Sequence, residues 1–231
     1  MRIWLTGASS GIGAALAAEL ERRGHSVSTT SRSGGTHPGD ITDRARMHEI
    51  GADLGELDLA VLNAGTYVPV EPDTFSADVF REHVDVNVLG TVHCIESVLP
   101  GMLERRRGRI AVVSSVTGYA ALPKAAAYGA TKAFLISMCD SLRADLAGRG
   151  VGVTVVAPGF VRTPLTDAND FPMPFLIDAD EAARIVADGL EEGKDEIAFP
   201  FRMAALMKLL GALPGPLARR YVAGVARRRA S

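Results

Sequence analysis

Short apolar runs alternate with longer amphipathic segments along most of the chain. Residues 2–6 form the first apolar run, and Ile12, Leu16 and Leu20 then recur at helical spacing within residues 12–23. The alternation continues to residue 199. It predicts further strands at 25–31, 40–41, 57–62, 109–114, 151–157 and 196–199, and further helices near 42–51 and at 76–103, 125–147 and 180–191.

This order of elements predicts the fold class. Strands that are apolar along their whole length are usually covered on both faces, as they are in parallel sheets. Regular alternation of strands and helices gives a doubly wound α/β fold of the Rossmann type, here with about seven strands and helices on both faces. No linker, internal repeat or low-complexity tract divides the chain, so residues 1–231 are predicted to form a single domain.

Composition narrows the class of protein. The 231 residues are 47% hydrophobic, with a mean hydropathy of +0.14, which is typical of a globular enzyme. The longest apolar runs fall short of the roughly 20 residues that a membrane span needs. The N-terminus turns to Gly and Ser by residue 7, without the apolar core of a signal peptide. Cys94 and Cys139 are too few for a disulfide framework and are predicted to be small core residues. We therefore expect a cytoplasmic location.

The charge is unevenly distributed. Seven bases and no acids follow Glu196, which leaves 18 bases against 27 acids, a net charge of −9, in residues 1–196. Residues 200–231 are thus a basic tail, and residues 201–213 within it have an amphipathic helical pattern that stops before Pro214. We favour packing of its apolar face over a cleft or a neighbouring subunit. Peripheral attachment to an anionic membrane is the less favoured interpretation.

A glycine-rich turn connects the first strand to the first helix. It reads Thr6-Gly7-Ala8-Ser9-Ser10-Gly11-Ile12-Gly13. Glycine lets the backbone approach a pyrophosphate closely, and the helix N-terminus that follows offers free N–H groups to the phosphates. In this strand–turn–helix context the turn predicts a dinucleotide site. The alternative is a glycine-rich turn without a ligand.

The end of the second strand bears on the choice of cofactor. NAD sites place an acid there to bind the ribose hydroxyl, whereas an arginine suits the additional phosphate of NADP. Arg32 lies between Ser31 and Ser33, and the first acid after it is Asp40. The sequence therefore favours NADP(H), with NAD(H) as the alternative cofactor. Arg32 as a solvated loop charge is the competing interpretation.

A hydroxyl, a phenol and an ammonium follow in the second half of the chain. Ser115 comes after a predicted strand, and Tyr128 and Lys132 form a Y-x-x-x-K motif within a predicted helix, where positions i and i+4 share a face. Such a set can act on a carbonyl group.

Six motifs together resemble the short-chain dehydrogenase/reductase family, in its compact single-domain branch, over residues 1 to about 199. They are T-G-A-S-S-G-I-G at 6–13, D-I at 40–41, L-N-A-G at 62–65, Asn87 in V-N-V-L-G, S-S-V-T-G with Y-G-A-T-K, and P-G-F-V-R-T at 158–163. The chain departs from the family pattern at Leu62, which replaces an Asn, and at Ser10, where NADP-preferring relatives often carry a base.

The resemblance implies an oxidoreductase that interconverts a carbonyl and an alcohol. Tyr128 would act as general acid in reduction and as base in oxidation. Lys132, close to the phenol, would lower its pKa from ~10 and would also bind the nicotinamide ribose. Ser115 would stabilise the carbonyl oxygen, and Asn87 would hold a water that relays protons.

The implied cofactor contacts are spread along the chain. Asn63, Ala64 and Gly65 would pass near the adenosine, and Val161 and Thr163 near the carboxamide of the nicotinamide. The full set is Thr6, Gly7, Ser9, Ser10, Gly11, Ile12, Gly13, Arg32, Asp40, Ile41, Asn63, Ala64, Gly65, Tyr128, Lys132, Pro158, Gly159, Val161 and Thr163. The five histidines show no metal-ligand spacing, so no metal is expected.

The expected partners are a small carbonyl or alcohol substrate and further copies of the chain. The apolar segment 164–176 favours an apolar or aromatic substrate, although these side chains could instead pack on the body. Relatives pair their long helices across two-fold axes, which implies a homodimer or homotetramer. No nucleic-acid partner is expected. A lyase or isomerase on the same scaffold, and a cofactor-binding redox sensor, are the alternative functions.

Overall fold

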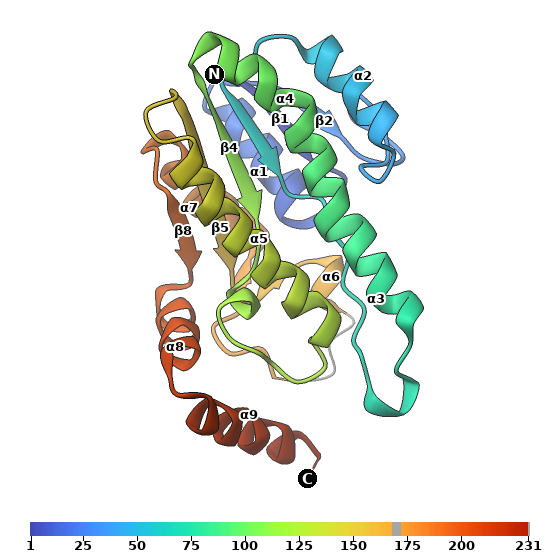
Figure 1. The fold of residues 1–231 in the computed structure, drawn as a ribbon, viewed down its shortest axis with the longest axis vertical. Helices are drawn as coiled ribbons and strands as arrows, with labels where there is room; N and C mark the ends of the chain where they lie inside the picture. The colour runs from blue at the N-terminus through green and yellow to red at the C-terminus, as the bar shows by residue number, and fades with distance from the viewer. Residues whose placement is uncertain (168–171, 231) are drawn as a thin grey trace.

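A parallel sheet forms the centre of the molecule (Figure 1). The computed structural model of the chain describes residues 1–167 and 172–230, and for residues 219, 221 and 225–230 it describes the backbone alone. The six strands run in the order β2-β1-β3-β4-β5-β8, and all neighbours are parallel. Their bounds are β1 Arg2–Thr6, β2 Ser26–Thr30, β3 Leu59–Leu62, β4 Gly108–Val113, β5 Val151–Pro158 and β8 Glu196–Phe199.

Helices cover both faces of this sheet, which confirms the predicted doubly wound α/β fold. One layer contains α2 (Arg44–Leu54), α4 (Thr91–Arg105) and α5 (Ala126–Asp145), and the other contains α1 (Gly11–Arg22) and α7 (Ala179–Glu191). In β1, Ile3 and Leu5 contact the α1/α7 layer while Trp4 contacts the other. Successive side chains of a strand point to opposite faces, so the two apolar cores explain why the central strand β3 is apolar along its whole length, whereas the edge strand β2 is largely polar.

The prediction of a short strand at residues 40–41 was wrong. The Asp40 carboxylate accepts hydrogen bonds from the backbone N–H and the hydroxyl of Thr42, at 2.9 and 2.8 Å, and the chain turns there. The sheet accordingly has six strands instead of about seven, and β2 lies at its edge. Residues 36–39 run beside this edge, where the N–H of His37 donates to the carbonyl of Thr29 over 3.0 Å.

The long helix predicted at 76–103 spans residues 77–105 in three parts. These are α3 (Ala77–His83), a π-helical segment η2 (Val84–Gly90) and α4. By length and hydropathy alone this 29-residue helix could cross a membrane. However, Cys94, Val98 and Met102 are buried against the sheet, so we interpret it as a helix of the core.

Shorter elements surround the carboxyl ends of the strands, and two further helices close the chain. Residues 201–212 form the predicted tail helix, and the structure adds a second helix after Pro214 that the sequence did not predict. The remaining bounds are η1 Pro72–Thr74, η3 Val116–Gly118, β6 Val161–Arg162, α6 Pro164–Asp167, β7 Ile177–Asp178, α8 Phe201–Ala212 and α9 Gly215–Ala230.

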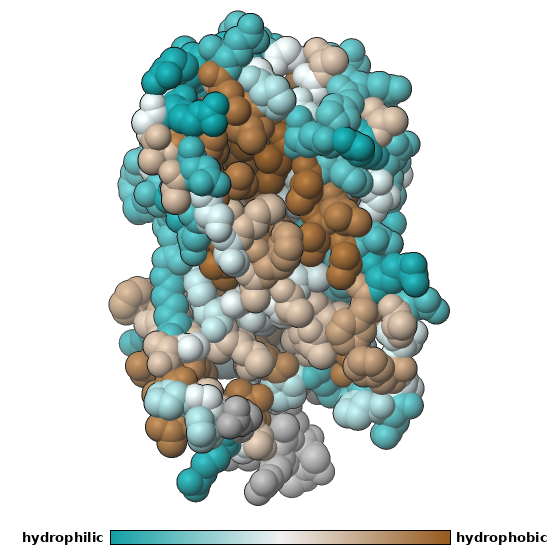
Figure 2. Space-filling view, viewed as in Figure 1, coloured by the Kyte–Doolittle hydropathy of each residue, from teal (hydrophilic) through white to brown (hydrophobic). Residues whose placement is uncertain are grey.

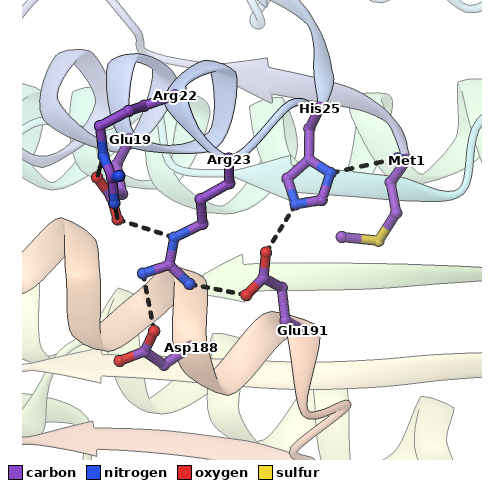
Figure 3. Close-up of polar contacts among 7 residues, drawn as sticks. All are labelled: Met1, Glu19, Arg22, Arg23, His25, Asp188 and Glu191. Carbon is purple, nitrogen blue, oxygen red and sulfur yellow. Dashed lines mark hydrogen bonds and ion pairs between the residues drawn. The ribbon is translucent and has the colours of Figure 1, made fainter.

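An ionic cluster joins α1 to α7 (Figure 3). Arg23, at the end of α1, contacts the carboxylates of Glu19 at 2.8 Å and of Asp188 and Glu191 at 2.7 Å. His25 contacts Glu191 at 2.8 Å. Hydrogen bonds from Arg22 and Arg23 lower the pKa of Glu19 to about 2, and those from His25 and Arg23 lower the pKa of Glu191.

This cluster predicts acid sensitivity. Because these carboxyl pKa values are depressed by folding, their stabilisation is fully present above the ordinary value of 4.5 and is lost as the pH falls towards about 2. We expect the free energy of unfolding, measured with urea, to decrease over this window. Arg23→Met should lower the free energy of unfolding at pH 7 and make its decrease between pH 4.5 and about 2 smaller. Arg149→Met, at an exposed position, should change neither quantity. An unchanged acid profile in Arg23→Met would contradict the assignment.

Candidate active site

The glycine turn after β1 forms a tightly packed cradle at the carboxyl end of the sheet. Gly7 has a φ of 72°, and a Cβ there would lie 2.6 Å from Ala64 Cα. A Cβ on Gly13 would lie 2.1 Å from the carbonyl oxygen of Gly7. Glycine is therefore required at both positions. The backbone can approach a ligand closely here, at the N-terminus of α1, where N–H groups are available to phosphates.

The segment after β3 braces this cradle. The Asn63 amide donates to the carbonyls of Thr6 and Gly7, at 3.2 and 3.0 Å. The Thr6 hydroxyl accepts from the N–H groups of Asn63 and Ala64, at 3.1 and 3.2 Å. A Cβ on Gly65 would lie 3.1 Å from Asn87 Oδ1. The strand order reverses between β1 and β3, which is where doubly wound sheets bind dinucleotides.

The remaining predicted cofactor residues border the same region. Ser9 and Ser10 are exposed, and the backbone of Ser10, directly before α1, is extended. Ile12 is partly buried and packs against the apolar core on the α1/α7 side of the sheet. Thr163 contacts the cradle from the opposite side, because its Cγ2 lies 3.0 Å from where a Gly11 Cβ would be. Pro158, Gly159 and Val161, at and after the end of β5, lead the chain to this position.

Arg32 lies beside the cradle, at the tip of a tight turn. The turn follows β2 and is closed by the bridge between Ser31 and Gly34, and the Arg32 side chain is exposed. The carbonyl of Thr30, at the end of β2, accepts from the N–H of Gly7 over 2.8 Å. Asp40 turns the chain through Thr42, and Ile41 is buried against Gly90.

Ser115, Tyr128 and Lys132 come together where β4 ends and α5 begins. Ser115 follows β4 and shares a hydrogen bond with the phenol of Tyr128. The Lys132 ammonium donates to the carbonyl of Val113 over 2.9 Å and lies 5.4 Å from the centre of the Tyr128 ring. The hydroxyl of the neighbouring Ser114 instead donates to the carbonyl of Lys132 over 2.8 Å and so connects the end of β4 to α5.

The predicted lowering of the Tyr128 pKa was wrong for this structure. Burial raises the pKa of Tyr128 to about 12, although the hydrogen bond with Ser115 opposes the rise. Burial also lowers the pKa of Lys132 to about 8. The ammonium points to a backbone carbonyl, so its charge offsets little of the desolvation of the phenol. At neutral pH the phenol therefore retains a proton that it can donate.

Asn87 is buried within the π-helical segment. Its amide oxygen accepts from the N–H of Thr66 over 2.7 Å, and its amide nitrogen donates to the carbonyl of Thr66 and to the hydroxyl of Thr131, at 3.0 and 3.1 Å. Asn87 thus connects the loop after β3 to α5, which it contacts at Thr131, the residue before Lys132. A π-helical turn is rare and often marks a functional position. The proton-relay role of Asn87 stays a prediction.

Two residues of the site were missed by the sequence analysis. His83 is fully buried, accepts from the N–H of Val68 over 3.1 Å and lies 2.7 Å from the carbonyl of Val79, so its ring holds the loop after β3. Tyr67, in this loop, packs edge-on against Tyr128 with ring centres 5.1 Å apart. Neither residue belongs to a motif, and only the folded chain brings them to the phenol.

A small apolar pocket opens beside the Ser115 and Tyr128 hydroxyls. It encloses about 80 Å³, and Thr166 adds a polar group to a lining that is otherwise largely apolar. The pocket is lined by Tyr67, Ser115, Val116, Thr117, Leu122, Pro123, Ala125, Tyr128, Gly159, Phe160, Leu165 and Thr166. Leu165 belongs to the segment 164–176 predicted to contact substrate, of which residues 168–171 lie outside the described residues.

No metal centre accompanies this site in the part of the chain that the structure describes. There, no group of three or more histidine, cysteine, aspartate or glutamate side chains could hold a metal ion. Cys94 and Cys139 are buried free thiols in the core, as the sequence predicted. The fold and the glycine cradle thus define a dinucleotide-binding protein of the doubly wound class.

Comparison with known proteins assigns the family. A family model for short chain dehydrogenases matches residues 35–171, more than half of the chain. An uncharacterized oxidoreductase of Myxococcus xanthus (strain DK1622) is 38% identical over 234 residues, with 92% of each chain covered. A short chain dehydrogenase from Burkholderia cenocepacia J2315, solved in complex with NADP, has 27% identity and a TM-score of 0.83, covering 95% of this chain and 99% of that one.

The same fold recurs in a short chain dehydrogenase/reductase from Burkholderia phymatum, solved in complex with NAD, at 21% identity and a TM-score of 0.81 over 90% of this chain and 91% of that one. The protein described here belongs to the short-chain dehydrogenase/reductase family and is an oxidoreductase with a nicotinamide-dinucleotide-binding Rossmann fold.

Proposed function

We propose that the protein reduces small apolar or aromatic ketones or aldehydes to alcohols with NADPH, and catalyses the reverse oxidation. The observation that carries this proposal is the position of the Ser115 and Tyr128 hydroxyls at the wall of an apolar pocket. Ser115 follows β4 and the glycine cradle follows β1, so both lie at the edge of the sheet where the parallel strands end. The nicotinamide, when bound, supplies or accepts the hydride. The protein supplies position, a proton and stabilisation of the carbonyl oxygen.

Each polar side chain has one task in this mechanism. The Ser115 hydroxyl donates a hydrogen bond to the carbonyl oxygen and stabilises the negative charge that grows there. Tyr128 donates its proton to the same oxygen, and in the reverse direction it receives the alcohol proton. Lys132 supplies a buried positive charge behind the ring and the hydrogen bonds that would hold the cofactor ribose.

A panel of carbonyl compounds with the purified protein tests the proposal through the loss of NADPH absorbance. Apolar aryl ketones and aldehydes are expected to be reduced, and charged sugars to be poor substrates. Cofactor binding without turnover of any compound would instead favour a redox sensor. Conversion of substrate without a change in the cofactor would favour a lyase or isomerase.

The cofactor preference is expected to depend on Arg32, whose side chain is exposed beside the cradle. We expect NADPH to bind more tightly than NADH. A charge-assisted contact to the 2′-phosphate contributes about 1.5–3 kcal/mol, so Arg32→Ser should reduce the preference by about tenfold or more. Fluorescence titration with both cofactors measures this, with Arg149→Ser as the matched control. Equal affinities of the unaltered protein for the two cofactors would rule out a phosphate contact.

We also propose a homodimer or homotetramer in the cytoplasm. Val84 and Leu89 on η2 and Phe134 on α5 are between 42% and 48% exposed. Figure 2 shows a wide apolar area over α4 and α5. Burial of such a face against a second copy would remove this surface from water. Light scattering at micromolar concentration should give a multiple of the chain mass, and a monomer mass would contradict the proposal.

A further inference from the structure

The helix α8 has two apolar faces, of which one is covered. Met203, Ala204, Met207 and Leu210 are buried. This inner face packs against the segment after β4 and against the loop after β5, where it contacts Val116, Tyr119, Leu122 and Phe160. Val116, Leu122 and Phe160 also line the substrate pocket. The predicted packing of the tail over a cleft is therefore present, through one side of α8.

The outer face of α8 is also apolar and faces solvent. Phe201, Ala205, Leu209 and Ala212 follow one another at helical spacing, and all four are exposed. Phe201 is 81% exposed and Leu209 is 63% exposed, and Leu217 on α9 is 52% exposed. In Figure 2 apolar atoms gather over α8 at the lower left. A surface helix normally directs polar residues outward, so this face is suited to a partner.

The charge around this face specifies the partner. Seven bases and no acids follow Glu196. Arg202 on α8 and Arg220 on α9 are exposed, and Lys208 pairs with Glu196. The body has a net charge of −9 over residues 1–196, with 18 bases against 27 acids. An anionic surface would attract the tail and repel the body, which gives the molecule one preferred orientation.

We propose that α8 and α9 form a surface that binds anionic lipid bilayers. A second copy of the chain fits less well, because pairing these faces would bring two base-rich, acid-free segments together. Helix α8 has 12 residues, roughly 18 Å, so it is too short to span and lies in the plane of the interface. Figure 1 shows α8 and α9 at the end of the molecule away from the N-terminus, so the body can remain in water.

The proposed orientation has a consequence for the substrate, which rests on the proposed function. The wall of the substrate pocket would lie about 10 Å, the thickness of one helix, from the lipid. An enzyme held there would meet apolar carbonyl compounds where they are concentrated.

Vesicle co-sedimentation of the full chain tests the proposal. We expect binding to phosphatidylcholine vesicles that contain phosphatidylserine, weak binding to phosphatidylcholine alone, and a decrease with added salt. The double variant Phe201→Glu/Leu209→Glu, and separately Arg202→Glu/Arg220→Glu, should weaken binding by at least about tenfold while the thermal unfolding midpoint is maintained. Phe75→Glu is the matched control, because Phe75 is 66% exposed outside this surface.

Three outcomes would overturn the proposal. One is the absence of phosphatidylserine-dependent binding in the unaltered protein. Another is equal loss of binding in Phe75→Glu, which would place the contact elsewhere. The third is a decrease in oligomer mass in Phe201→Glu/Leu209→Glu without any change in vesicle binding, which would identify a second copy as the partner. Carbonyl reduction measured without vesicles should be unchanged in all variants, so a failure of the proposed activity is distinguishable from a failure of membrane binding.

Discussion

Replacing Tyr128 with Phe is expected to reduce carbonyl turnover by about 10²–10⁴-fold, because the variant lacks the only proton donor that the mechanism assigns to the carbonyl oxygen. The fold should survive the change. The ring keeps its edge-on contact with Tyr67 at 5.1 Å between centres, and the lost hydroxyl leaves Ser115 with neighbours at Pro158 and Thr117. NADPH affinity should change little, since the phenol reaches the substrate more than the cofactor.

Tyr119→Phe is the matched control for this variant. The Tyr119 hydroxyl donates to the Glu196 carboxylate over 2.6 Å and does not face the pocket, so turnover should be retained. The assay uses the best substrate of the carbonyl panel at saturating NADPH, with NADPH binding measured separately. Near-normal turnover of Tyr128→Phe would remove the tyrosine from the mechanism. A similar loss in both variants would indicate a general effect of removing a phenol from this region.

The sequence predicted the sheet and the glycine cradle well, for physical reasons. Parallel strands buried on both faces must be apolar throughout, which makes residues 59–62 and 151–158 conspicuous in the sequence. The cradle is set by sterics, since a Cβ at Gly7 or Gly13 would overlap backbone atoms. Constraints of this kind act on one residue at a time and are therefore visible without the fold.

Other features depend on contacts that no local pattern encodes. The strand expected at 40–41 is replaced by a turn because the Asp40 side chain bonds to Thr42. The π-helical segment around Asn87 lies inside the stretch 76–103, which the sequence predicts as one continuous helix. Tyr67, in the loop after β3, and His83, at the end of α3, come close to Tyr128 only in the folded chain.

The Tyr128 pKa shows the same limit. The spacing of Tyr128 and Lys132 correctly placed both on one face of α5, but the sequence could not show that the ammonium donates to Val113 or how deeply the phenol is buried. These two facts decide the sign of the shift, since desolvation raises the pKa and a nearby positive charge lowers it. The outer apolar face of α8 was likewise part of a predicted amphipathic helix, and only the packed structure shows which side is covered.

Gly13→Ala is expected to abolish measurable cofactor binding, and its steric cause is explicit. The new Cβ would lie 2.1 Å from the Gly7 carbonyl oxygen and 2.5 Å from the Asn63 amide nitrogen. Neither neighbour is free to move, because Asn63 donates to that same oxygen over 3.0 Å and the N–H of Gly7 donates to Thr30 over 2.8 Å. Relief of the overlap must therefore displace the cradle. Such overpacking typically destabilises by about 1–3 kcal/mol.

Urea unfolding and NADPH fluorescence titration measure the two effects. Gly224→Ala is the control, since its Cβ would meet no heavy atom within 4 Å, and Ala in a helix is favoured over Gly by roughly 0.5–1 kcal/mol. Normal NADPH affinity in Gly13→Ala would show that the cofactor does not depend on this turn.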